Sequence, residues 1–140
     1  MDADSTKCVM IIDERLPVGV IANTAAILGI SLGKIFPEAV GTDVTDKSGN
    51  AHLGIIEFPV PVLKGSPELI REIRQRLYTK EFEDVAAVDF SETAQGCRTY
   101  DEFVKKIADT EEEKLLYLGI GIFGGKKKIN KLTGSLPLLK

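Results

Sequence analysis

The sequence predicts an α/β fold, a single-domain layer sandwich around a mixed sheet of about four strands. Three observations support this prediction. Short apolar or β-branched runs alternate with helical segments in the order β-α-β-α-β-α-β-α. The chain has 140 residues, which is the length of one domain with a sizeable core. No internal repeat or low-complexity tract divides it, so we treat residues 1–140 as one domain.

The opening stretch, CVMIIDERLPVGVIANTAAILGISLG, occupies residues 8–33. Cys8–Ile12 is apolar and partly β-branched, which predicts a buried strand. Pro17 suits the first position of a helix because its missing N–H would have no intrahelical partner there. The residues that follow are apolar on almost every side, so we expect this helix to be buried broadly. Gly29 and Gly33 fall on one of its faces and would let a neighbouring backbone approach closely.

Residues 35–54 form the least regular stretch. Turn residues at Asp46–Asn50 predict a loop excursion with a short hairpin, which is long enough to cover a neighbouring cleft. Residues 55–63, IIEFPVPVL, are strand-like, but Pro59 and Pro61 cannot donate to a ladder. We therefore expect this strand at an edge of the sheet.

The second half of the chain supplies the remaining elements. Ser66 is the expected N-cap of an amphipathic helix. Residues 84–91 form a third strand, which a polar loop at residues 92–98 follows. Thr99 and Glu102 form an expected capping box at the start of another short helix.

The last strand precedes a possible anion site. Leu115–Phe123 is almost continuously apolar, which predicts a central strand. Gly124 and Gly125 would let backbone N–H groups approach an anion, and Lys126 begins a lysine-rich helix that Gly134 is placed to end. The alternative is a solvated basic turn that keeps a sheet edge soluble.

Composition excludes several classes of function. A net charge of −3 gives no domain-wide attraction for nucleic acid, and 6% aromatic residues without tryptophan offer little for base stacking. No apolar run approaches the roughly 20 residues of a membrane span. The first seven residues, MDADSTK, lack the basic segment of a signal peptide. We expect a cytoplasmic protein.

Catalytic and metal-binding motifs are also missing. The single histidine, His52, argues against a Ser-His-Asp triad or a histidine zinc site. Cys8 and Cys97 are far apart in the sequence and form no metal or redox motif, so we expect two free thiols. Neither a dinucleotide-binding nor a P-loop glycine pattern is present. We expect no metal and no cofactor.

Polar residues at strand ends and within the first helix are the remaining site candidates. Asp13 follows the first strand, where a carboxylate acts as a base, orients a ligand or simply pairs within its turn. Asn23 and Thr24 interrupt the apolar helix and, if buried, need partners from the backbone or from a ligand. Thr93 and Gln95 lie in the loop after the third strand.

Two stretches resemble known families. Leu116–Ile122 and Ile129–Gly134 resemble the closing strand and helix of type II peptidyl-tRNA hydrolases, which read G-I-G-P and roughly I-D-K-V-T-G. The opening IIDERLPVGVIANTAAILG is similar to an uncharacterised family, domain of unknown function 2000. The resemblance to this second family covers nearly the whole chain. It implies the type II peptidyl-tRNA hydrolase fold.

The hydrolase motifs are incomplete in this sequence. The family's G-K-x-A-A-Q stretch enters the first helix, but here Gly19 is followed by Val20, and Asn23 stands near the glutamine. The family's D-A-G-R-T-Q loop corresponds to DFSETAQG, which keeps Asp89 and Gln95 but has no arginine. Because these cations are missing and the chain is acidic, tRNA is a disfavoured partner.

Three hypotheses follow, and the sequence leaves open whether the protein is an enzyme. In the first, a small anionic ligand binds a cleft at the strand ends between residues 13–19, 91–97 and 124–126. Its contacts would come from Gly19, Asn23, Thr24, Thr93, Gln95, Gly124, Gly125 and Lys126. The second is a divergent peptidyl-tRNA or related ester hydrolase with Asp13 or Asp89 positioning water. The third is a non-catalytic association module, most simply a homodimer through the first helix and an edge strand.

Overall fold

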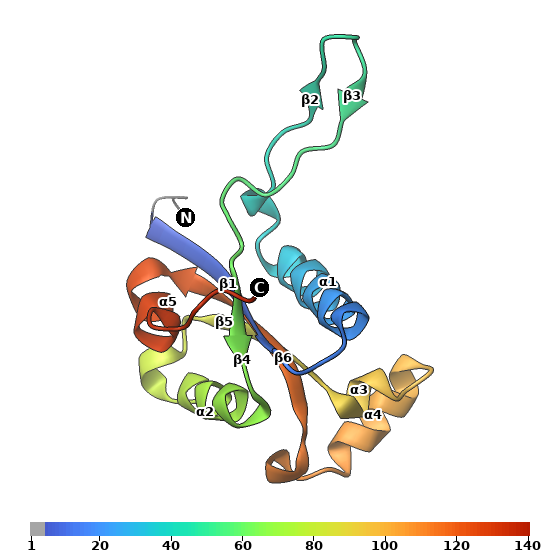
Figure 1. Ribbon diagram of the computed structural model, residues 1–140, viewed down its shortest axis with the longest axis vertical. Helices are drawn as coiled ribbons and strands as arrows, with labels where there is room; N and C mark the ends of the chain where they lie inside the picture. Colours follow the sequence, from blue (N-terminus) through green and yellow to red (C-terminus); the bar gives the residue numbers. More distant parts are fainter. Residues whose placement is uncertain (1–4) are drawn as a thin grey trace.

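The computed structural model describes residues 5–140 and places four strands in one mixed sheet (Figure 1). β1 (Thr6–Asp13) lies between β4 (Val62–Gly65), which is parallel to it, and β6 (Tyr117–Gly125), which is antiparallel. β5 (Ala86–Ser91) pairs antiparallel with β6, so the strand order is β4-β1-β6-β5. The predicted mixed α/β sheet, with the apolar last strand at its centre, is confirmed.

Helices cover both faces of the sheet. α1 (Val18–Ile35) packs on one face, whereas α2 (Pro67–Leu77) and α5 (Lys126–Thr133) pack on the other. Successive side chains of a strand point to opposite faces, so Val9 and Ile11 join the α2 side while Met10 and Ile12 join the α1 side. The structure therefore has two apolar clusters, one on each face of the sheet, and β1 and β6 contribute side chains to both.

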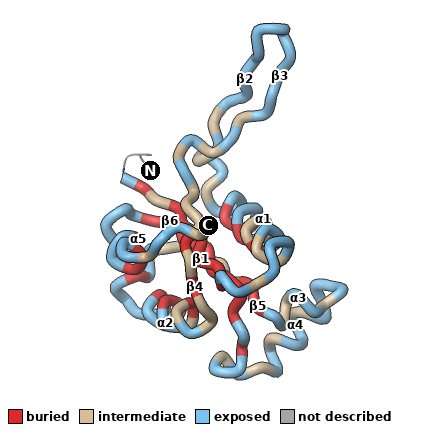
Figure 2. The backbone as a smooth tube through the Cα atoms, viewed as in Figure 1, coloured by how far each residue is buried: buried red, intermediate tan, exposed pale blue. Residues whose placement is uncertain are grey.

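α1 is much less buried than predicted. Its buried residues are Thr24, Leu28 and Leu32, which are four apart and form one stripe on the sheet. Val18 is 82% exposed and Ile30 is 78% exposed. Figure 2 shows that much of α1 has the pale blue colour of exposed residues. The expectation of broad burial is wrong because the sheet supplies only one face, and no other part of residues 5–140 covers the opposite side of α1.

The same helix corrects a second expectation. Among the described residues, α1 alone is long and apolar enough to cross a membrane by length and composition. The turn at residues 14–17 ties it to β1, which is paired on both sides within the sheet. A membrane crossing would have to pull the buried stripe of α1 off that sheet.

The edge strand is shorter than predicted but lies where expected. Of the predicted strand at residues 55–63, only residues 62 and 63 fall within regular β4, which continues to Gly65 and is the first strand in the order. Its outer side is occupied by the C-terminal segment, since the Lys64 N–H donates to the Pro137 carbonyl at 2.9 Å. The Leu139 N–H donates to the Val62 carbonyl at the same distance.

The helix caps predicted from the sequence are confirmed in part. The Ser66 hydroxyl accepts the Leu69 N–H at 3.1 Å and begins α2 as expected. The Thr99 hydroxyl accepts the Glu102 N–H at 3.1 Å at the start of α4 (Tyr100–Ala108). The Glu102 carboxylate, however, accepts the Arg98 N–H at 2.8 Å, so the reciprocal capping box is not closed.

Short helical turns complete the chain. The expected polar loop after β5 contains α3 (Glu92–Gln95), which lies with α4 beyond the carboxyl end of β5. Single 3₁₀ turns occur at η2 (Pro37–Ala39), η3 (Lys80–Phe82) and η4 (Glu112–Lys114).

Residues 40–56 form a hairpin arm that projects from the body beyond the end of α1 (Figure 1). Its strands are β2 (Val44–Thr45) and β3 (Ala51–His52). The expected turn is present, because an Asp46 carboxylate oxygen accepts the N–H groups of Ser48 and Asn50 at 2.9 and 3.0 Å. The arm points away from the sheet and covers no cleft at the strand ends.

Candidate functional site

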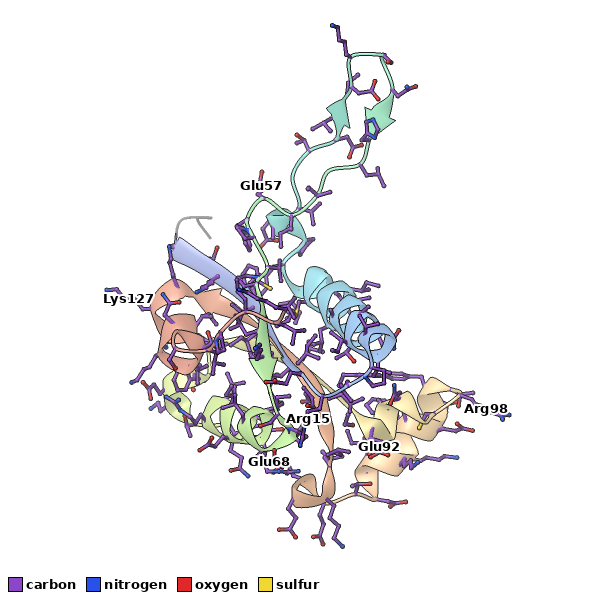
Figure 3. The ribbon with its side chains drawn as sticks, viewed as in Figure 1. Arg15, Glu57, Glu68, Glu92, Arg98 and Lys127 are labelled. Carbon is purple, nitrogen blue, oxygen red and sulfur yellow. The ribbon has the colours of Figure 1, made fainter. Side chains whose placement is uncertain are left out.

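The three turns expected to form one cleft lie at two different ends of the sheet. Because β1 and β6 are antiparallel, Thr6 stands opposite Gly125 and Ile12 stands opposite Gly119. Gly124–Lys126 therefore lies where β1 begins, whereas Asp13 and Ser91 lie at the other end. Figure 3 shows the same separation between the labelled Lys127 and Arg98. The single-cleft expectation is wrong because it took all three connections to leave the sheet at one edge.

Both candidate catalytic aspartates are paired with arginines. Asp13 is buried, and one of its oxygens accepts the backbone N–H of Arg15 at 3.0 Å and its Nε–H at 3.2 Å. Asp89 lies 3.2 Å from the Arg74 side chain on the α2 side of the sheet. Burial raises the pKa of Asp89, and the Arg74 charge offsets part of that rise. Both carboxylates are therefore already paired, although Asp89 also borders a hollow of about 400 Å³ between β5 and α4.

The remaining polar candidates are dispersed. Thr24 is fully buried, and its hydroxyl donates to the Val20 carbonyl at 2.7 Å within its own helix. Asn23 is exposed on the opposite side of α1, as is Gly19. Thr93 and Gln95 lie on α3, away from the lysine turn.

A mostly apolar pocket of about 370 Å³ lies beside α1, on the sheet face that α1 covers. Its walls come from β1, α1, the base of the arm and the segment entering β4, and include Cys8, Met10, Leu32, Phe36, Val62 and Phe123. This volume lies within the range of small-molecule sites. The sequence did not reveal the pocket because its walls come from separate segments between residues 8 and 123.

Glycines of α1 keep this pocket open. A Cβ atom on Gly29 would lie 3.9 Å from the Met10 methyl carbon, and one on Gly33 would meet nothing within 4 Å. Larger side chains at these positions would therefore occupy free space. The Cys8 thiol in the pocket wall is not a nucleophile at neutral pH, because burial raises its pKa to about 11.

Aromatic side chains connect the pocket to the lysine turn. The rings of Phe36 and Phe123 stack with centroids 4.0 Å apart, and Phe58 packs against Phe123 at 5.7 Å. Phe58 also borders a surface hollow of about 420 Å³ that Lys7, Glu57 and Lys126 line. A small hollow of about 30 Å³ shares Phe36 and Phe123 with the pocket and Glu57 and Phe58 with the surface hollow. The apolar pocket and the charged surface hollow are therefore neighbours.

Most cations near the lysine turn already have partners. Lys128 contacts Asp84 at 2.8 Å, Lys131 contacts Glu81, and Lys7 donates to the Asn130 side chain at 2.7 Å. Lys127 points away from the body, and Glu57 lies at the base of the arm (Figure 3). None of the ion pairs within residues 5–140 includes Lys126, so no carboxylate offsets its charge there.

A separate polar network ties α2 to the turn before β6. The Arg71 guanidinium donates to the Glu112 carboxylate at 2.8 Å and to the Leu115 carbonyl. The Tyr117 hydroxyl and the Gln75 amide donate to the same carboxylate at 2.8 and 3.2 Å. Burial, followed by the bond to Glu112, raises the pKa of Tyr117. These groups satisfy one another, so the network holds the fold together.

Other reactive groups stand apart. His52 pairs with Asp46 at 2.7 Å on the exposed arm, and Cys8 and Cys97 are both free thiols. Within the described residues, no three His, Cys, Asp or Glu side chains are grouped to hold a metal.

Comparisons with known proteins agree with the fold. A solved structure of the protein of unknown function Atu0240 from Agrobacterium tumefaciens strain C58 aligns with a TM-score of 0.85. The two chains are 20% identical, and the alignment covers 96% of this chain and 97% of the other. No curated protein matches the sequence. The family model described as "Protein of unknown function (DUF2000)" matches residues 6–140, so the chain belongs to the DUF2000 family.

Proposed function

We propose that this protein binds a small amphipathic anion. The apolar part of the ligand occupies the pocket beside α1, and its anionic group lies near Lys126. The observation that carries the proposal is the junction at Phe58 and Phe123, where the apolar pocket adjoins the lysine-lined surface. Ligand sites commonly combine a mostly apolar lining with a few polar groups that fix orientation.

The charges of the adjoining surface support an anion over a cation. In the larger hollow Lys7 and Lys126 outnumber the one carboxylate, Glu57, and a second carboxylate, Glu38, lines only the small hollow beside it. The chain as a whole carries a net charge of −3, so a local excess of positive charge contrasts with its surroundings. The apolar pocket in turn favours an alkyl or aromatic group. Burying such a group stabilises the complex by roughly 25 cal/mol for each Å² of apolar surface removed from water.

Thermal unfolding in the presence of straight-chain carboxylates, from hexanoate to dodecanoate, tests the proposal. A ligand that binds only the folded state raises stability by RT ln(1 + [L]/Kd). We expect the stabilisation to grow with chain length until the pocket is filled. The matched alcohols should stabilise less, because they lack the charge that Lys126 attracts. Equal effects of acids and alcohols would contradict the role of Lys126.

Two variants separate ligand binding from damage to the fold. Gly29→Leu fills the pocket and, by replacing glycine in a helix, raises the stability of the free protein by about 0.5–1 kcal/mol. It should abolish the response to decanoate. Lys126→Glu should weaken binding of decanoate but not of decanol, and Lys127→Glu, its outward-pointing neighbour, serves as the control. Normal decanoate binding by Gly29→Leu would place the ligand elsewhere.

We also propose that the fold is of the type II peptidyl-tRNA hydrolase kind. The order of strands and helices and the glycine-containing β6 followed by α5 support this proposal. Hydrolysis of peptidyl-tRNA gains no support from Asp13 and Asp89, because both carboxylates are paired. Salt-sensitive binding of tRNA, together with release of the peptidyl group, would favour the hydrolase instead.

Two free cysteines suit a reducing cytoplasm, where we expect the protein to reside.

A further inference from the structure

α1 presents an exposed, nearly uncharged face to solvent. We define this outer face by Val18, Ala22, Ala26, Gly29, Ile30 and Gly33, which share one side of the helix and are all exposed. Lys34, at its margin, is the only charged residue of the whole helix. By contrast, α2, α4 and α5 each carry at least four charged residues. A helix face that contacts only water normally carries charged side chains, so the apolar composition of this face needs another explanation.

The hairpin arm is a second uncovered apolar surface. Val44 is 59% exposed, Leu53 82% and Ile55 80%, and every residue from 42 to 53 is exposed. An isolated two-stranded hairpin is marginally stable at best in water, so this arm lacks the packing that would normally order it. The arm leaves the body just beyond the C-terminal end of α1, so the two surfaces adjoin (Figure 2).

We propose that two copies of this chain associate about a two-fold axis, with their α1 outer faces packed antiparallel and each arm lying along its partner. A face that packs on itself must be free of charge near the axis, since every charge there would meet its own copy. The outer face meets this requirement. Its alanines and glycines also permit close approach of two helix backbones.

The available apolar area matches what such a dimer needs. Six Val, Leu and Ile side chains of the outer face and the arm are between 47% and 82% exposed. At roughly 100 Å² for a fully exposed aliphatic side chain, burying them would remove on the order of 400 Å² of apolar surface per copy, to which the alanines of the outer face add. A standard interface buries about 800 Å² per partner, of which about 60% is apolar. The two surfaces together therefore supply the apolar part of one interface.

The lengths of the two elements are also compatible. An 18-residue helix is about 27 Å long, and the two sides of the arm, residues 40–46 and 50–56, each span about 20 Å although only two residues of each side are β-strand. In an antiparallel pair, the arm of each copy passes the amino-terminal end of its partner's α1. The edge strand β4 does not take part, because the C-terminal segment occupies its outer side. The inference is independent of the proposed ligand.

Sedimentation equilibrium of the full chain at micromolar concentrations tests the dimer. We expect twice the 15.3 kDa mass of one chain for the unmodified protein. Ala26→Glu, at the centre of the outer face, should give a monomer, and Leu53→Ser should raise the dissociation constant at least tenfold. Ala108→Glu, the same change at an exposed site on α4, should leave the dimer intact. Circular dichroism of each variant checks that the fold persists.

Disulfide formation locates the interface. In a Cys97→Ser background, Ala26→Cys should form an intermolecular disulfide on mild oxidation, because residue 26 lies close to the axis and meets its own copy. Glu72→Cys on α2 should not. A monomeric unmodified protein, or a dimer that Ala26→Glu leaves intact, would overturn the proposal. So would a monomer that binds phosphatidylcholine vesicles through the same face.

Discussion

At the scale of single residues, two glycines of β6 let α1 lie close to the sheet. A Cβ atom on Gly119 would lie 2.7 Å from the Thr24 methyl group, and one on Gly121 would lie 3.0 Å from a Leu32 methyl carbon and 2.8 Å from the Met10 sulfur of β1. We predict that Gly119→Ala lowers the free energy of unfolding by about 1–3 kcal/mol through overpacking. Thr24→Ser removes the clashing methyl group, so urea unfolding of the double variant should recover part of the loss. Additive effects of the two changes would show that the methyl group is not the obstacle.

A second residue-scale prediction concerns acid stability. Burial acts to raise the pKa of Glu112, but hydrogen bonds from Tyr117 and Gln75 and the Arg71 charge outweigh it, so the net pKa is lowered. Its contribution to stability is therefore complete above the unfolded pKa of about 4.3 and is lost as pH falls through the lower folded value. Glu112→Gln should cost about 1 kcal/mol in urea unfolding at pH 7, since the side chain is 35% exposed and partly screened. The difference should shrink at pH 3, whereas the exposed neighbour Glu113→Gln should cost little at either pH. A cost for Glu112→Gln that does not change with pH would refute this account.

At the scale of elements, the arm should behave independently of the body. A Cβ atom on Gly54 would lie 1.9 Å from the Gly41 carbonyl oxygen, so Gly54→Ala should separate the two strands at the base of the arm. In the monomeric Ala26→Glu background, where no partner holds the arm, we expect faster amide hydrogen exchange across residues 42–53 and little change in the melting temperature of the body. Gly41→Ala is the matched control, because only the flexible Glu57 side chain must move. A large fall in the melting temperature for Gly54→Ala would show that the arm supports the core.

The elements also show what the sequence predicts well. Local chemistry marked the N-cap at Ser66, the turn at Asp46–Asn50 and the edge position of β4, because each depends on residues close in sequence. Strand direction depends on distant pairing, so the antiparallel course of β6 and the resulting separation of Lys126 from Asp13 were not predictable. The prediction that α1 is buried on almost every side was wrong for a related reason. Apolar composition shows that a surface avoids water but not which neighbour covers it.

At the scale of the whole molecule, α1 organises two surfaces. Leu32 of its buried stripe, together with Ala25, Gly29 and Gly33, forms one wall of the apolar pocket, and its outer face is free for a second copy. Gly29 and Gly33 belong to both surfaces, so the dimer would lie directly beside the mouth of the pocket. The two proposals nevertheless fail separately, because the decanoate response of Gly29→Leu and the mass of Ala26→Glu are different readouts.

The central claim is that the pocket beside α1, and not the Asp13 end of the sheet, holds the ligand. Titration of the ¹⁵N-labelled protein with decanoate, followed by amide chemical shifts, tests it most directly. We predict concentration-dependent shifts at Gly29, Phe36 and Phe123, with a further shift at Lys126 that decanol does not cause. Shifts confined to Asp13 and Ser91, or no shifts up to the solubility limit of decanoate, would contradict the account.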